Sequence, residues 1–180
     1  MKISDKIFFV IQSCIKYNSF GWGIWLRSFL YKFFFKKFGK NIQIKDGVTF
    51  KYPSEIEMGS NIKIGEFSYF VGKGGLYLGD NVLIGAGTKI ITSTHNFDDL
   101  ETSMFDQGLS FSPIRIKNDV WFGFDCKVFG NTIINEGVII GANSLIKNTE
   151  TPSYVILAGN PAKFLRKRGG AETKELSDNL

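Results

Sequence analysis

The sequence predicts an all-β solenoid, a coil of short strands, and three observations support this fold class. A six-residue repeat that begins with a large apolar residue runs through most of the 180-residue chain, as in Ile84 to Lys89 (IGAGTK) and Ile140 to Leu145 (IGANSL). A period of six fits neither an amphipathic helix nor an alternating strand, but it suits short strands joined by tight turns. The repeat is interrupted once, by a segment that contains the only histidine, His95.

The repeat predicts which side chains fill the core. Each coil would stack its large apolar residue on that of the coil before, and one coil alone would not be stable. These residues are Met58, Ile64, Phe70, Leu78, Ile84, Ile90, Ile116, Phe122, Val128, Ile134, Ile140 and Ile146. The small or β-branched fifth position should also point inward, at Ser68, Val82, Thr88, Val120, Cys126, Thr132, Val138 and Ser144. Glycine often follows the large residue, where it would let the backbone turn at little steric cost.

The chain divides into three parts. Residues 1–41 lack the repeat and form an aromatic helical segment. Residues 42–160 carry the coils, with degenerate early repeats and with residues 91–115 as an inserted loop, about 20 residues longer than one repeat requires. Residues 161–180 leave the solenoid as a short C-terminal extension with a basic cluster at 166–168, and we expect its polar tail to be a short helix or disordered.

The N-terminal segment predicts two helices, Ile3 to Tyr17 and Trp22 to Phe38, and has two interpretations. One is a cap that packs aromatic side chains on the open end of the solenoid. The other is a helix in the membrane interface, with aromatic residues inserted and lysines facing anionic headgroups. Its residues would be Trp22, Trp25, Phe33 to Phe35, Lys32, Lys36, Lys37 and Lys40. Charges within the apolar stretches argue against a span, and no small-residue cleavage site follows, so no signal peptide is predicted.

Charge and cysteine content constrain the compartment only weakly. The net charge of +5 allows a polyanionic ligand or a membrane surface, although most of the excess lies at the two ends, where it can simply be solvated. Cys14 and Cys126 are far apart, and Cys126 occupies an inward position of the repeat. A buried thiol is therefore favoured over a disulfide, and nothing indicates an oxidising compartment.

Four motifs together resemble a known family. They are THNFDD (Thr94 to Asp99), NDVWFG (Asn118 to Gly123), IIGANSLIK (Ile139 to Lys147) and AGNPAKFLRKR (Ala158 to Arg168). Residues 40–168 resemble the hexapeptide-repeat acyltransferases, and within them the bacterial sugar O-acetyltransferases related to maltose and galactoside acetyltransferases. The resemblance implies a left-handed parallel β-helix and a homotrimer with active sites between subunits. It also implies acetyl-CoA as co-substrate and no metal.

The resemblance assigns His95 as the general base, and the chemistry of imidazole favours the same role. An alcohol is a poor nucleophile at neutral pH, so a side chain that exchanges protons near neutrality is needed to remove its proton. Direct transfer needs no covalent intermediate if both substrates are held together. Asp98 would orient the imidazole, although Asp99 or a backbone carbonyl could do the same, and the backbone N–H of Phe124 would stabilise the developing oxyanion. The alternative for His95 is an ordinary polar loop residue.

Other residues match the family's substrate contacts. Asn96, Phe97 and Asp99 would shape the acceptor site, although a surface turn rich in aspartate is equally consistent with the sequence. Contacts with acetyl-CoA would come from Trp121, Gly123, Ala142, Ser144, Lys147, Lys163, Arg166 and Arg168, with the basic residues meeting phosphates. Trp121 could instead pack on a neighbouring subunit.

The chain departs from the family pattern at three places. Asn131 stands where glycine is common, and Lys147 is displaced by one position. Both departures concern the CoA contacts. No asparagine matches the acceptor-site asparagine of maltose-type relatives near Tyr69 to Gly72, which argues against a simple galactoside as acceptor.

We therefore expect a cytoplasmic acetyl-CoA:sugar O-acetyltransferase of surface polysaccharide or lipopolysaccharide biosynthesis, peripheral on the inner membrane face if residues 1–40 bind lipid. Its acceptor would be a glycan, a nucleotide sugar or a lipid-linked sugar, and no nucleic acid is expected. An N-acetyltransferase of an amino-sugar nucleotide would use the same fold, donor and base. A non-catalytic scaffold would not need the histidine loop. A γ-type carbonic anhydrase needs three zinc-bound histidines, and the chain has one histidine.

Overall fold

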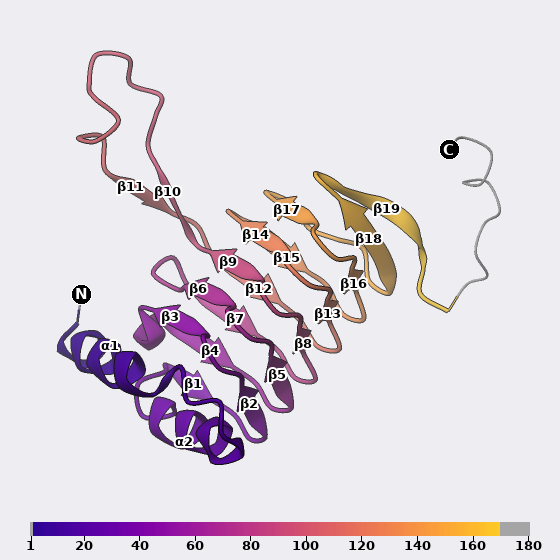
Figure 1. The fold of residues 1–180 in the computed structure, drawn as a ribbon. Coiled ribbons are helices and arrows are strands. Elements are labelled where there is room, and N and C mark those ends of the chain that lie inside the picture. The colour runs from indigo at the N-terminus through magenta and orange to yellow at the C-terminus, as the bar shows by residue number, and fades with distance from the viewer. Residues whose placement is uncertain (1, 170–180) are drawn as a thin grey trace.

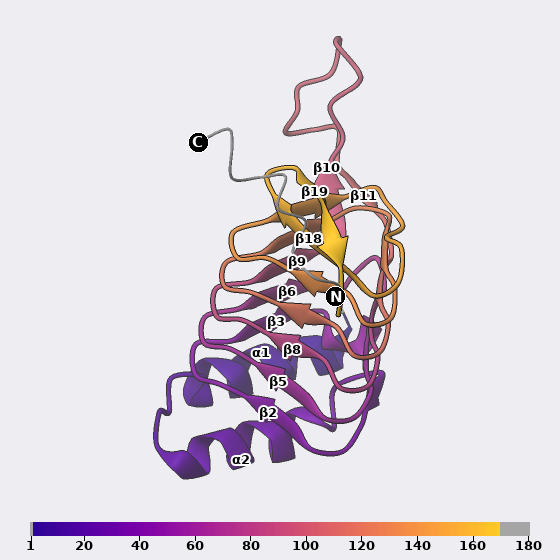
Figure 2. The ribbon, with the colours of Figure 1, turned by 90° about the vertical axis from the view of Figure 1, so that its right-hand side faces the viewer.

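The computed structural model describes residues 2–169 and forms a β-solenoid of about six turns, with two helices at its N-terminal end (Figure 1). A view turned by 90° shows the coils stacked on one another, with the two helices below the first coil (Figure 2). The predicted polar tail lies outside the described residues.

Three parallel sheets form the walls of the solenoid. The first sheet contains β1 (Lys37–Phe38), β4 (Ile56–Met58), β7 (Leu76–Leu78), β12 (Ile114–Ile116) and β15 (Thr132–Ile134). The second contains β2 (Ile42–Ile44), β5 (Ile62–Ile64), β8 (Leu83–Ile84), β13 (Trp121–Phe122), β16 (Ile139–Ile140) and β18 (Val155–Gly159). The third contains β3 (Thr49–Lys51), β6 (Tyr69–Val71), β9 (Lys89–Ile91), β14 (Lys127–Phe129) and β17 (Leu145–Lys147).

The strand register shows where the coil changes length. Ile42 of β2 pairs with Ile62 of β5, so one early coil takes 20 residues. Ile114 of β12 pairs with Thr132 of β15, so a late coil takes 18 residues. The early coils place their extra residues at a corner, where the 3-10 helix η1 (Pro53–Glu55) precedes β4. The early repeats predicted to be degenerate therefore form complete, hydrogen-bonded coils.

The predicted core is confirmed. Every large apolar position of the repeat is at most 4% exposed, and every predicted fifth position is at most 1% exposed. Small inward hydroxyls are satisfied by the coil itself, as when the Ser68 hydroxyl donates to Gly65 O at 2.9 Å. The six-residue period therefore predicts the side chains that bury apolar surface, which is the main contribution to stability in this fold.

The glycine after the large residue has a different role from the one predicted. A Cβ at Gly123 would lie 2.6 Å from Ala142 N, so glycine is needed because adjacent coils approach closely. The left-handed backbone at the corners lies elsewhere, for example at Asn41, Asn61 and Asn81, with φ between 54° and 60°. The amides of these three asparagines form a ladder with N–O distances of 3.0 Å.

The N-terminal helices are α1 (Ile3–Ile15) and α2 (Gly21–Tyr31). The prediction that the second helix runs to Phe38 is wrong, because the chain leaves the helix after Tyr31 and Lys37–Phe38 form β1. Strand β1 pairs with β4, whose edge at the end of that sheet would otherwise lack hydrogen-bond partners.

The two helices cap the first coil through buried polar side chains. The Gln12 amide accepts from Phe50 N at 2.7 Å and donates to Phe50 O at 3.2 Å, as a neighbouring strand would do. Arg27 is fully buried and donates to Ile44 O at 2.9 Å, and its burial lowers the pKa of the guanidinium. The Ser28 hydroxyl donates to Ile42 O at 2.6 Å. The helices therefore pack on the first coil as the cap interpretation expected, but Trp22 and Trp25, which were predicted to pack there, are 56% and 64% exposed.

The C-terminal extension folds back on the last coil. Strand β19 (Ala162–Lys167) pairs antiparallel with β18, so this end of the solenoid is closed by a hairpin. Arg168 forms an ion pair with Asp119 at 2.6 Å and donates to Gly137 O at 3.2 Å. These contacts hold the extension against two earlier coils.

Candidate active site

The inserted segment is an antiparallel hairpin rather than a structureless loop. Strands β10 (Ser93–His95) and β11 (Leu109–Phe111) pair with His95 opposite Leu109. The hairpin projects away from the solenoid after β9 (Figure 1). The register step from Leu76 in β7 to Ile114 in β12 is 38 residues, which is one 18-residue coil plus the 20 extra residues predicted.

His95 is exposed, and its imidazole has no hydrogen-bond partner among residues 2–169. The Asp98 carboxylate also has no partner within the described chain, so the predicted contact between Asp98 and His95 is not formed in this structure. The His95 imidazole and the Asp98 carboxylate therefore both face solvent without a hydrogen-bond partner within residues 2–169.

Two of the predicted acceptor residues stabilise the hairpin tip. The Asn96 amide donates to Gln107 O at 2.9 Å and accepts a short hydrogen bond from the Ser110 hydroxyl. The Asp99 carboxylate accepts from Glu101 N at 2.9 Å, and a further hydrogen bond from Thr102 lowers its pKa. These bonds occupy side chains that were predicted to face substrate.

The role of Gln107 was not predicted from the sequence. Its amide donates to Asp99 O and Thr102 O, both at 2.8 Å, and accepts from Asp99 N at 3.2 Å. One side chain therefore ties together the tip of the hairpin. Such a role depends on a fold-back within the insertion, and no spacing pattern in the sequence signals it.

A pocket of about 470 Å³ lies at the base of the hairpin. Phe97 and Lys147, which were predicted to contact acceptor and donor respectively, both line it. Its other lining residues come from the hairpin and from the ends of β14 and β17, and include Thr94 beside His95. The structure thus brings an acceptor-side residue and a donor-side residue of the prediction into one cavity.

A second group of predicted residues lies at the corner between β13 and β14. Trp121 is 51% exposed on β13, and Gly123 lies against Ala142 of the next coil. The Phe124 N–H has no acceptor within the described chain, and Phe124 N lies close to Gly85 of the preceding coil, 2.8 Å from where a Cβ there would be. Glu66 N, Ala86 N and Ala142 N at equivalent corners also lack an acceptor within the described chain, so this is a property of the corner and does not distinguish Phe124.

The remaining residues predicted to contact acetyl-CoA differ in how exposed they are. Ser144 is fully buried, and its hydroxyl donates to Gly141 O at 2.6 Å and accepts from Gly159 N at 3.0 Å. Its side chain is therefore part of the coil and does not face the surface. Arg168 is engaged by Asp119, and Arg166 is partly exposed and donates to Lys167 O at 3.3 Å, whereas Lys163 is exposed on β19.

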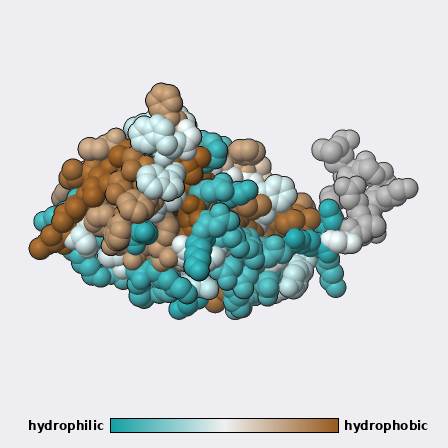
Figure 3. Space-filling view, turned by 90° about the horizontal axis from the view of Figure 1, so that it is seen from below, coloured by the Kyte–Doolittle hydropathy of each residue, from teal (hydrophilic) through white to brown (hydrophobic). Residues whose placement is uncertain are grey.

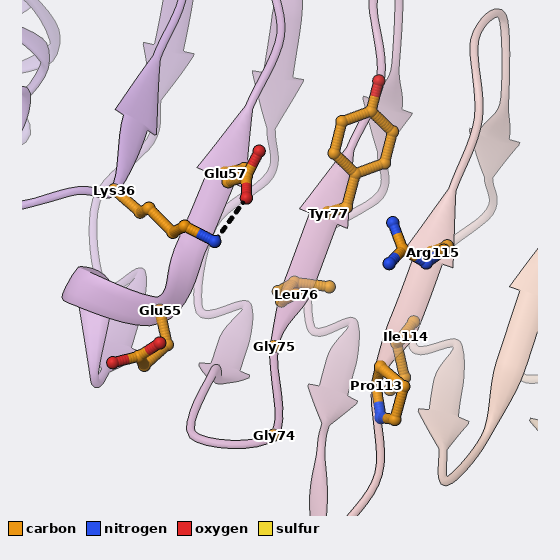
Figure 4. Close-up of a pocket in the computed structure, with 10 residues that line it drawn as sticks. All are labelled: Lys36, Glu55, Glu57, Gly74, Gly75, Leu76, Tyr77, Pro113, Ile114 and Arg115. Atoms are coloured by element: carbon orange, nitrogen blue, oxygen red, sulfur yellow. Dashed lines mark ion pairs between the residues drawn. The ribbon is translucent and has the colours of Figure 1, made fainter.

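A smaller cavity of about 170 Å³ lies on the outer face of the first sheet (Figure 4). Lys36 and Glu57 form an ion pair across it at 2.8 Å, and that contact raises the lysine pKa. Tyr77 and Arg115 extend from the neighbouring strands (Figure 4). None of the predicted catalytic residues lines this cavity, so it is separate from the pocket beside the hairpin.

Comparison with known proteins identifies the family. No family model matches the chain. Galactoside O-acetyltransferase of Escherichia coli is 31% identical over 147 residues, which cover 78% of this chain and 68% of the relative. The chain belongs to the hexapeptide-repeat acetyltransferase family. WcaF of the same organism, named for colanic acid biosynthesis, is 28% identical over 142 residues, 79% of this chain and 75% of WcaF.

Other relatives extend this family assignment. The acetyltransferase Rv3034c of Mycobacterium tuberculosis is 28% identical over 131 residues, and the chain spans only 43% of its length. A galactoside acetyltransferase solved with coenzyme A has 25% identity and a TM-score of 0.81, covering 91% of this chain and 80% of that one. A hexapeptide-repeat acetyltransferase of Vibrio cholerae also reaches a TM-score of 0.81, at 22% identity, with coverage of 91% and 86%. The fold is therefore the left-handed parallel β-helix of this acyltransferase family.

Proposed function

We propose that this acetyltransferase moves an acetyl group from acetyl-CoA to a sugar hydroxyl, with His95 as general base. The single observation that carries the proposal is the position of His95. It is exposed, has no hydrogen-bond partner among the described residues, and ends β10 of the hairpin inserted in the coil, where its neighbour Thr94 lines a pocket together with Phe97 and Lys147. Imidazole there can accept the hydroxyl proton as the oxygen bonds to the thioester carbon, and when the C–S bond then breaks the imidazolium can return that proton to the departing CoA thiolate.

The proposed site is shared between subunits of a homotrimer. His95 lies on the hairpin, whereas the free Phe124 N–H lies at the corner after β13, and the chain forms no contact between them. Leu100 and Phe105 at the hairpin tip are 94% and 93% exposed. Apolar side chains this exposed favour burial against a second copy of the chain. That copy would supply the corner donor and a partner for the imidazole.

A sugar hydroxyl is favoured over an amine by the relatives. The galactoside O-acetyltransferase is 31% identical to this chain. The N-acyltransferase AntD of Bacillus cereus is only 22% identical, with a TM-score of 0.59, which is a similarity of fold alone. The WcaF relative supports a surface polysaccharide or its precursor as the acceptor. Cytoplasmic synthesis of such precursors is consistent with acetyl-CoA as the donor.

The test combines ligand binding with turnover. Millimolar acetyl-CoA should raise the melting temperature of both the wild type and His95→Ala, because a ligand of the native state stabilises it by mass action. Release of the CoA thiol should require a sugar acceptor, and His95→Ala should lower its rate by about 10²–10⁴-fold. Leu109→Ala, the cross-strand neighbour of His95, is the matched control for damage to the hairpin.

Three results would contradict the proposal. Near-normal turnover of His95→Ala would remove the general base, and faster reaction with amino-sugar nucleotides than with hydroxyl acceptors would favour N-acetylation. Absence of a melting shift in either protein would argue against acetyl-CoA as the donor.

A further inference from the structure

Helix α2 has its polar and apolar faces reversed relative to an ordinary surface helix. The face that packs on the solenoid carries Gly23, Arg27 and Tyr31, all buried. The outward face carries an exposed aromatic stripe at helical spacing, Trp22, Trp25 and Phe29, which Phe33 continues in the turn after the helix; these side chains are 42–67% exposed. A soluble helix normally buries its aromatic residues and exposes its arginine. The sequence therefore places large apolar side chains where only another surface can cover them.

Helix α1 shows the same inversion. Two of its three buried residues, Asp5 and Gln12, are polar. Its outward face is apolar, with Ile3 76% exposed, Ile7 50% exposed and Val10 62% exposed, at positions one helical turn apart. Both inversions follow from the cap, because the first coil needs hydrogen-bond partners and the helices supply them from their inner faces.

The two outward faces lie at the same end of the molecule. Seen from below, this end shows a broad area of apolar and aromatic residues bordered by hydrophilic ones (Figure 3). Trp25 and Phe29 stack with ring centroids 5.2 Å apart, so the exposed rings are ordered by each other and not by the core. A contiguous apolar surface of this kind marks an interaction site.

The net positive charge of residues 1–41 indicates an anionic partner for this apolar surface. Residues 1–41 contain eight Lys and Arg against one Asp, a net charge of +7, whereas residues 42–180 contain 14 against 16, a net charge of −2. Of these eight cations Arg27 is buried and Lys2 and Lys36 pair with glutamates, which leaves Lys6, Lys16, Lys32, Lys37 and Lys40 to face a partner. Lys32 Nζ lies 4.6 Å from the Phe29 ring centroid and 4.9 Å from that of Phe33, so this cation sits directly within the aromatic stripe. Aromatic residues with adjacent lysines match the interface of an anionic bilayer.

We propose that the outward faces of α1 and α2 dock on the surface of an anionic lipid bilayer. No helix in residues 2–169 is both long and apolar enough to cross a membrane, so the helices would lie in the interface plane. In a cyclic trimer three equivalent caps lie at one level along the symmetry axis, so three weak contacts would act together. The surface is remote from the chemistry, and this inference does not depend on which acceptor the enzyme uses.

Vesicle binding tests the proposal directly. The Trp121→Phe background leaves Trp22 and Trp25 as the only tryptophans. Vesicles of phosphatidylcholine with about one third phosphatidylglycerol should shift the fluorescence emission of these two tryptophans to shorter wavelength. The protein should also sediment together with these vesicles. Pure phosphatidylcholine should bind less, and added salt should weaken the anionic binding because it screens the lysines.

Matched variants locate the surface. Trp25→Ser with Phe29→Ser should reduce vesicle binding at least about tenfold, because both rings would leave water on docking. Phe164→Ser is the control, an aromatic residue 56% exposed on β19 at the other end of the solenoid, and it should bind as the wild type does. Unchanged circular dichroism and melting temperature would show that each variant is folded, and retained stabilisation by acetyl-CoA would show that the catalytic half is intact.

Three outcomes would overturn the proposal. Equal binding of the Trp25/Phe29 variant and the Phe164 variant would place lipid contact elsewhere. Absence of sedimentation with anionic vesicles would remove the membrane as partner. A fall in the mass of the assembly, measured by sedimentation equilibrium for the Trp25/Phe29 variant without lipid, would identify the patch as a contact between copies of the chain.

Discussion

At the scale of single residues, the two cysteines occupy opposite environments. Cys126 is fully buried at a fifth position of the repeat, and its Sγ lies 3.2 Å from Gly141 O and 3.3 Å from Gly123 O. Burial raises the pKa of this thiol. Cys14 is exposed on the outer side of α1. The thiolate is the reactive form, so the two residues should differ strongly in reactivity.

We expect Ellman's reagent to label one thiol per native chain and two after denaturation. Cys14→Ser should abolish the native reaction and leave the denatured one at a single equivalent. Because the folded state raises the Cys126 pKa, the stability it contributes is complete below the ordinary thiol pKa and falls as pH rises above it. Cys126→Ala should therefore show a flatter loss of stability at alkaline pH. Rapid labelling of native Cys14→Ser would contradict this account.

The repeat predicts buried residues better than it predicts exposed ones. The repeat predicts that Ser144 lies in the core, whereas the family motif predicts that it contacts acetyl-CoA. In the structure its side chain is buried in the core. Arg168 was assigned to phosphate, yet it pairs with Asp119, 49 residues away. Only the stacking of coils brings those two residues together, and a local motif does not encode that distance.

At the scale of elements, the N-terminal cap shows how a solenoid ends. The first coil has a free edge on each sheet, and the Gln12 side chain, Arg27 and β1 each satisfy part of it. The sequence predicted the helices from the absence of the repeat, but not the return to β1. The stretch Phe33 to Phe38 is apolar enough for a helix, and pairing with β4 decides in favour of a strand.

The Gln12 contact predicts a specific loss of stability. Gln12→Leu keeps the volume but leaves the buried Phe50 N–H and C=O without partners, so the free energy of unfolding should fall by about 2–4 kcal/mol. Ser13→Ala, on the exposed side of the same turn, should change it by less than about 0.5 kcal/mol. Urea unfolding followed by circular dichroism measures both. A Gln12 variant as stable as the Ser13 variant would show that the helix does not close the strand edge.

At the scale of the whole molecule, the two halves of the proposed site lie on different parts of one chain. The hairpin carries His95 and the exposed apolar tip, and the corner after β13 carries the free Phe124 N–H and Ala142. In our proposal a neighbouring copy in a cyclic assembly completes this divided site. The sequence predicts both halves, but the one-dimensional order of residues cannot tell whether they meet within a chain or between chains.

Subunit mixing distinguishes these arrangements. His95→Ala removes the base, and Ala142→Trp fills the exposed corner where the donor is expected to lie, so each homotrimer should be inactive. In randomly mixed trimers with equal amounts of both variants, a site formed by two neighbours is intact in about one quarter of cases. Co-refolding should therefore recover about one quarter of wild-type turnover, measured by release of the CoA thiol. Sites contained within one chain would recover none, and a mixture that stays inactive while sedimenting as a mixed trimer would refute the shared site.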